Sequence, residues 1–119
     1  MFFIRVFFHI MTAPSKVTGV TVTPSSMDGS PTLRVTWTGP TGSGIRYIVK
    51  YSTTDQASPP EDAEKQTTST KPVTLTEGIQ PGTKYYVWVA AIKNGVQGSY
   101  SNKMSANSIS GKVDSATFA

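Results

Sequence analysis

The amino-acid sequence predicts an all-β protein, a seven-stranded antiparallel Greek-key β-sandwich. Apolar and polar residues alternate in short segments, clearest at 33–37, 45–51 and 85–91, as in strands that bury one face. Tight-turn signals separate the segments, notably Pro81-Gly82 and Asn94-Gly95. Alternating segments punctuated by such turns favour two sheets packed face to face.

The composition narrows the class of protein. A chain of 119 residues is expected to form one domain, and it contains no cysteine, so a disulfide or a thiolate metal site is excluded. The formal net charge is +4, but the basic residues are scattered, whereas a nucleic-acid footprint would cluster them. We expect solvated strand faces and edge lysines that deter aggregation, and no nucleic-acid partner.

Residues 1–12 differ in kind from the rest of the chain. They hold four of the five Phe residues, and they are too short to span a bilayer, which needs about 20 apolar residues. Arg5 interrupts the apolar run, which makes a poor signal peptide. Three interpretations stay open: the end of a longer signal or membrane segment, a misplaced gene start, or a small hydrophobic anchor. Membrane contact is expected only through such a truncated or missing segment.

The first half of the domain is expected to contain three long strands. Valines at 17, 20 and 22 indicate the first, and 24–31 is rich in turn-forming residues. Residues 33–37 form the second, with Leu33, Val35 and Trp37 pointing inward. Residues 45–51 form the third, with Tyr47 and Val49 on the inner face.

The second half is expected to complete the sandwich. Residues 64–68 suggest a short edge strand and 73–75 another strand. The next strand runs from 85 to about 92, and Asn94-Gly95 is the strongest hairpin signal. Residues 99–106 form the last strand, and 112–119 a tail or linker. The acidic residues at 55, 61, 62 and 64 lack EF-hand spacing, so a solvated loop is expected there rather than a calcium site.

Four segments together resemble a fibronectin type III domain, an immunoglobulin-like β-sandwich, over residues 13–111. They are Pro-x-x-Val-x-x-Val at 14–20, the tryptophan ending the second strand, Tyr-x-Val-x-Tyr at 47–51, and Ile-x-Pro-Gly-Thr-x-Tyr-x-Val-x-Val at 79–89. An immunoglobulin domain would carry its tryptophan on the third strand, beside a disulfide. The resemblance implies a set of structural residues: Trp37, Tyr47, Val49, Pro81, Gly82, Tyr85, Val87 and Val89. Among them, the Tyr85 hydroxyl is expected to bond backbone near residues 79–80.

Catalytic chemistry is not expected. The only histidine, His9, lies outside the predicted domain, so a Ser-His-Asp triad cannot be assembled within it. Phosphate-loop, His-Glu-x-x-His and Arg-Gly-Asp motifs are also absent from the sequence. We therefore predict no catalytic, cofactor-binding or metal-binding residue, no cofactor and no small-molecule substrate.

The resemblance implies a non-catalytic protein-interaction or adhesion module. Such domains occur as repeats in cell-surface and extracellular multidomain proteins, where the partner is a protein or an adjacent domain. The alternative is a structural spacer in a secreted bacterial carbohydrate-active enzyme or a phage surface protein. Sequence on either side of the domain would discriminate between the two.

Alternation also predicts a candidate protein-binding face. If Val87 and Val89 point inward, Tyr86 and Trp88 point outward, beside the outward residues of 45–51. Such residue types are enriched at binding hot spots. The alternative is that Trp88 stacks on the stem of Arg46 or Lys50 and only covers its own sheet. With the adjoining hairpin, the predicted face comprises Arg46, Ile48, Lys50, Tyr86, Trp88, Lys93, Asn94, Gly95, Val96 and Gln97.

Overall fold

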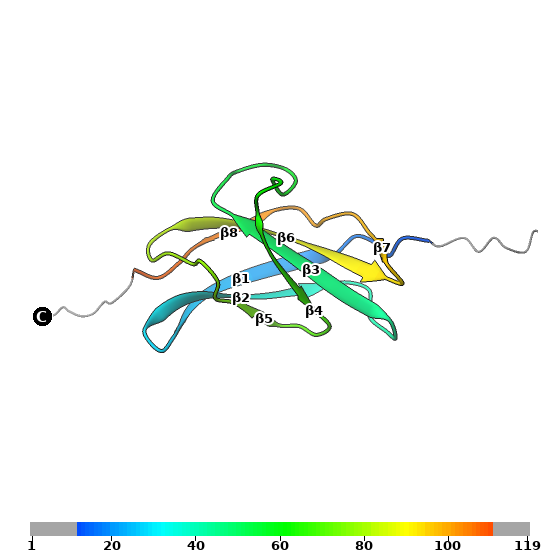
Figure 1. Ribbon diagram of the computed structural model, residues 1–119, viewed down its shortest axis with the longest axis horizontal. Helices are drawn as coiled ribbons and strands as arrows, with labels where there is room; N and C mark the ends of the chain where they lie inside the picture. Colours follow the sequence, from blue (N-terminus) through cyan, green and yellow to red (C-terminus); the bar gives the residue numbers. More distant parts are fainter. Residues whose placement is uncertain (1–11, 111–119) are drawn as a thin grey trace, which may run out of the picture.

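Two antiparallel sheets pack face to face in the computed structural model, which describes residues 12–110 (Figure 1). One sheet has the order β1-β2-β5, from Thr18–Met27, Ser30–Thr38 and Val73–Leu75. In the other, β4 pairs with β3, β3 with β6, and both β7 and β8 with β6. The bounds of these strands are Glu64–Thr68 (β4), Ile45–Ser52 (β3), Lys84–Lys93 (β6), Val96–Gln97 (β7) and Met104–Asn107 (β8).

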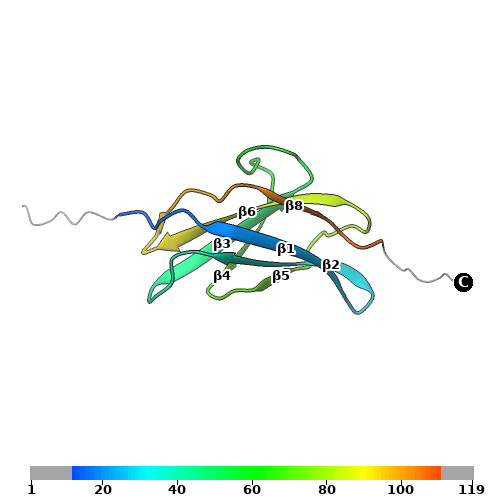
Figure 2. The same cartoon turned by 180° about the vertical axis from the view of Figure 1, so that it is seen from behind.

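The predicted all-β sandwich is confirmed. The first, second and fifth predicted strands form one sheet and the others form the second, and the two sheets are seen from opposite sides in Figures 1 and 2. Within residues 12–110, no helix is long and apolar enough to cross a membrane. The predicted extension 1–12, apart from exposed Thr12, and the tail 112–119 lie outside the described residues.

The structure has eight strands in its described part, one more than predicted. Val96–Gln97, which was expected in the hairpin loop, forms β7, and the predicted last strand at 99–106 is wrong before Met104, where β8 begins. Between these two strands, Gly98 N donates to Ala91 O (2.8 Å) and Ser101 N to Val89 O (2.7 Å). The Ser101 hydroxyl then accepts from Val89 N (3.0 Å), taking the place of a backbone carbonyl. A side chain at Gly98 would collide with the carbonyl of Pro14, so the segment before β1 is packed directly on this interruption.

Two hairpin turns have the same construction. Asn94 and Gly95 have φ of 52° and 81° between the paired Lys93 and Val96, which confirms the predicted hairpin signal and shows a two-residue turn. Asp28 and Gly29 have φ of 51° and 81° between β1 and β2. The prediction of a turn over all of 24–31 is therefore wrong: this narrow turn matches the twist of the strands, so pairing continues to Met27 and Ser30.

Trp37 lies in the core between the sheets, as predicted, with 3% of its surface exposed. Its ring meets that of Tyr47 edge to face, with centroids 5.0 Å apart, and the Tyr47 hydroxyl donates to Pro40 O (2.6 Å). Val49, Val87 and Val89 belong to the same buried cluster, each fully covered. Such edge-to-face contact and complete burial make Trp37 a main source of stability.

The corner before β6 is closed by Tyr85, as predicted. Its hydroxyl accepts from Gln80 N (2.8 Å) and donates to Gly78 O (3.2 Å). Gly82 follows Pro81 with φ of 57°, which confirms the predicted turn and explains the glycine. The five-residue separation of Tyr85 from Gln80 makes this corner a local feature.

A second buried tyrosine neighbours the corner. The Tyr51 hydroxyl donates to Glu77 O (2.7 Å), and its ring lies 6.4 Å from that of Tyr85. Burial, helped by the nearby carboxylates of Glu64 and Glu77, raises the pKa of Tyr51 from 10.0 to about 12. Ionising Tyr51 would place a negative charge in the core. The folded state is therefore more stable when Tyr51 is the neutral phenol.

Candidate protein-binding face

The predicted alternation along β6 is confirmed. Tyr85, Val87 and Val89 belong to the core between the sheets, so Tyr86 and Trp88 lie on the opposite, outer face. Across the ladder, Lys50 pairs with Trp88, Ile48 with Ala90, and Arg46 with Ile92. The outward residues that alternation selected on β3 and β6 therefore do share one face.

The expectation that Trp88 is an exposed contact residue is wrong. Its exposed fraction is 0%, and Ile48 on the same face is 7% exposed. The cover is loop 53–63, which joins β3 to β4 and is the large green loop at the top of Figure 1. The Trp88 indole Nε1 donates to Ala57 O (3.1 Å) in this loop. Trp88, Ile48 and Ala90 thus form a second apolar cluster, separate from the main core.

Polar contacts hold loop 53–63 in place. The Asp55 carboxylate forms an ion pair with Lys103, although about half of each side chain is exposed. Thr54 N donates to Ser52 Oγ (3.1 Å) at the start of the loop, and Ala63 N donates to Pro60 O (3.1 Å) at its end. Within residues 12–110, no group of His, Asp or Glu side chains is arranged to hold a metal ion.

Tyrosines and lysines occupy the uncovered part of the outer face. The ammonium groups of Lys84 and Lys103 lie 5.6 and 5.7 Å from the ring centroid of Tyr86. Lys50 lies 5.8 Å from the ring centroid of Tyr100. These separations are those of cation–π contacts. We refer to these five residues as the lysine–tyrosine surface.

Three members of this surface were missed by the sequence analysis: Lys84, Tyr100 and Lys103. Lys84 lies two residues before Tyr86 and therefore on the same outer face, so extending the alternating pattern to residue 84 would have predicted it. Tyr100 and Lys103 lie in the irregular segment between β7 and β8, where no alternation assigns a face. Only the folded chain brings them beside Lys50 and Tyr86.

The predicted binding residues do not form one continuous patch. The hairpin residues Lys93, Asn94, Gly95 and Gln97 are exposed, Val96 is half-buried, and they adjoin exposed Arg46 at one end of the sheet. Tyr86 pairs with Ser52 toward the other end, six residues from Ile92 along β6, or about 20 Å. The covered pair Ile48 and Trp88 lies between these two exposed groups.

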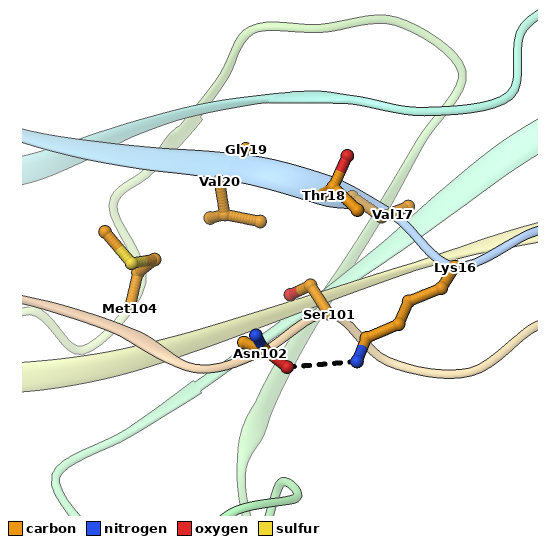
Figure 3. Close-up of a pocket in the computed structure, with 8 residues that line it drawn as sticks. All are labelled: Lys16, Val17, Thr18, Gly19, Val20, Ser101, Asn102 and Met104. Atoms are coloured by element: carbon orange, nitrogen blue, oxygen red, sulfur yellow. Dashed lines mark hydrogen bonds between the residues drawn. The ribbon is translucent and has the colours of Figure 1, made fainter.

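A separate pocket of about 350 Å³ opens between the start of β1 and the segment before β8 (Figure 3). Lys16 Nζ donates to Asn102 Oδ1 (3.0 Å) across one end, and Met104, 43% exposed, borders it on the β8 side. No sequence pattern predicted this pocket. Apolar and polar side chains both line it. The lining residues are Lys16, Val17, Thr18, Gly19, Val20, Ser101, Asn102 and Met104.

Comparison with known proteins identifies the family. The family model described as "Fibronectin type III domain" matches residues 12–107. A crystal structure of an Fn3-like protein from Clostridium thermocellum is 29% identical, with a TM-score of 0.60, covering 87% of this chain and 100% of that one.

Two animal structures share the fold. The sixth fibronectin type III domain of human fibronectin type III domain containing protein 3 is 18% identical, with a TM-score of 0.61 and coverages of 92% of this chain and 98% of that one. The FN1–FN3 domains of chicken CNTN1 are 20% identical, with a TM-score of 0.60, and the match covers 82% of this chain and 35% of that one. With the sandwich topology, the tyrosine corner and the match over residues 12–107, the chain belongs to the fibronectin type III family.

Proposed function

We propose that this domain is a non-catalytic protein-interaction or adhesion module of a larger cell-surface or extracellular multidomain protein. Fibronectin type III domains are typically interaction or spacer modules. The observation that supports an interaction role here is Tyr86, half-buried on the outer face and flanked by the cations of Lys84 and Lys103. Tyrosine is among the residue types that are enriched at binding hot spots, and the two lysines add positive charge beside it.

The path of the chain supports a place among neighbouring domains. The described chain enters at one end of the sandwich, beside β7, and leaves at the other (Figures 1 and 2). Neighbouring domains attached at these opposite ends would leave the outer face of the β4-β3-β6 sheet open to a partner. Members of the family commonly sit beside other domains and occur in extracellular and surface proteins, which supports the proposed localisation.

A spacer role in a bacterial secreted protein is the second candidate. It is favoured by the 29% identity to the Clostridium thermocellum protein, against 18% and 20% for the human and chicken domains. A spacer needs rigidity and two opposite ends but no contact face. Sequence flanking the domain separates the contexts: a membrane span or receptor domain supports the first, and a glycoside hydrolase domain supports the second.

A photo-crosslinking experiment tests the interaction role. A photoreactive amino acid replaces Tyr86 in the full-length parent protein, and in a matched control it replaces Thr36, which is exposed on the outer face of β2. The interaction role predicts a discrete protein adduct from position 86 and little from position 36. A spacer predicts no discrete adduct at position 86, and adducts at position 36 alone would place the contact on the wrong sheet.

A further inference from the structure

We infer that the lysine–tyrosine surface binds an acidic polypeptide segment with carboxylates at alternate positions. This inference rests on the proposed interaction function and specifies the chemistry of the partner. It involves Lys50, Lys84 and Lys103, the rings of Tyr86 and Tyr100, and Lys65 of β4.

The outward positions of the second sheet carry charge of one sign. On β3, β4 and β6 these positions hold Arg46, Lys50, Lys65 and Lys84 and no carboxylate. Glu64, the acidic residue of β4, pairs with the core residue Tyr51 and so lies on the opposite, inner face of the sheet. The charges at the outward strand positions are therefore uniformly basic, whereas Asp55, Glu61 and Asp62 on this side of the sheet belong to loop 53–63.

Lysines gather at two places on this face. Lys50 and Lys65 are directly opposite each other on neighbouring strands, an arrangement that is destabilising without an anion. Lys84 and Lys103 both lie within 6 Å of the Tyr86 ring centroid. A carboxylate placed between Lys50 and Lys65 would relieve their repulsion, and one placed at Lys84, whose neighbour Lys103 is already paired with Asp55, would gain a charge-assisted hydrogen bond.

The spacing of the two pairs fits an extended peptide. Lys50 is opposite Trp88, and Tyr86, the centre of the other pair, lies two residues away on β6, or about 7 Å. In an extended chain, side chains on one face recur at the same interval of two residues. Acidic residues at alternate positions can therefore reach both pairs at once.

The outer face already holds one peptide, which favours a polypeptide over a sulfated polysaccharide. Loop 53–63 places the Asp55 carboxylate on Lys103 and the Ala57 carbonyl on the Trp88 indole (3.1 Å). Within residues 12–110 this is the one ion pair, so Lys50, Lys65 and Lys84 have no carboxylate partner there. A bound acidic segment would extend to these lysines the contacts that the loop makes with Lys103.

The binding test uses a fluorescent peptide of alternating Glu and Thr and the full chain, followed by fluorescence anisotropy. We expect binding that weakens as salt is raised, because the contacts are exposed charge pairs. The double variant Lys50→Gln/Lys84→Gln should lower affinity about tenfold. The matched control Arg34→Gln/Lys71→Gln removes the same charge from β2 and from the turn before β5, and should change affinity by less than about twofold. Tyr86→Leu should weaken binding roughly threefold through loss of the cation–π contacts.

Three results would overturn the inference. Equal losses from both double variants, each shown by circular dichroism to be folded, would mean attraction by net charge alone. Tighter binding of a heparin oligosaccharide than of the peptide, weakened by the same variants, would assign the surface to a sulfated glycan. Failure of the peptide to bind while position 86 still gives a protein crosslink would refute the acidic partner and leave the proposed function standing.

Discussion

Replacing Trp88 by alanine tests the burial of the second apolar cluster. Trp88 is fully covered by loop 53–63 and bonded through its indole to Ala57 O. Complete burial of an indole removes about 200 Å² from water, which at roughly 25 cal/mol per Å² gives an upper bound of about 5 kcal/mol. The alanine methyl group retains part of this burial free energy, and loop 53–63 can move into the cavity that the indole leaves. We therefore expect a loss of about 3–4 kcal/mol in the free energy of unfolding.

Urea denaturation followed by far-ultraviolet circular dichroism measures this loss. Trp88→Phe is the matched control, because it keeps an aromatic ring and removes the N–H group that bonds Ala57. Since exposed Ala57 can offer its carbonyl to water instead, this variant should lose only about 1–2 kcal/mol. A loss below about 1 kcal/mol for Trp88→Ala would show that the indole is not covered and refute the reasoning.

Four further variants test other parts of the fold. Trp37→Ala should lower the free energy of unfolding by about 3–5 kcal/mol, and a loss near zero would exclude Trp37 from the core. Tyr85→Phe should cost on the order of 1 kcal/mol, because two backbone groups at the corner lose their partner; an unchanged melting temperature would contradict that corner. The stabilisation that neutral Tyr51 provides is complete below pH 10 and is lost as pH rises through about 12. Tyr51→Phe should therefore lose less stability than wild type between those two pH values, and an identical fall would argue against its burial. Gly98→Ala should cost about 1–3 kcal/mol, since its methyl group would collide with the Pro14 carbonyl, and a neutral effect would mean that this contact is loose.

The sequence predicted features that depend on local spacing. Tyr85 bonds a backbone amide only five residues away, so the corner could be predicted from the motif alone. Asn94-Gly95 likewise specified its own turn, because both residues tolerate positive φ. Alternation then assigned Trp37 to the core and Trp88 to the outer face, and both assignments are confirmed.

Features that depend on contacts between distant segments could not be predicted in this way. Alternation states which side of a sheet Trp88 faces, but its exposure depends on a bond to Ala57, 31 residues earlier in the chain. The ion pair that ties loop 53–63 down joins Asp55 to Lys103, 48 residues apart. No local pattern marks either contact, and so Trp88 was expected on the surface while Tyr100 and Lys103 were overlooked.

The central claim is that the lysine–tyrosine surface binds a partner while Trp88 stays covered beneath loop 53–63. Titrating the ¹⁵N-labelled domain with the alternating Glu-Thr peptide, and following its ¹H–¹⁵N spectrum, tests both halves at once. We predict amide shift changes concentrated at residues 50, 65, 84–86 and 100–105, with the Trp88 indole N–H protected from solvent exchange throughout. Changes centred on β1 and β2, or rapid exchange of that indole proton, would contradict the account.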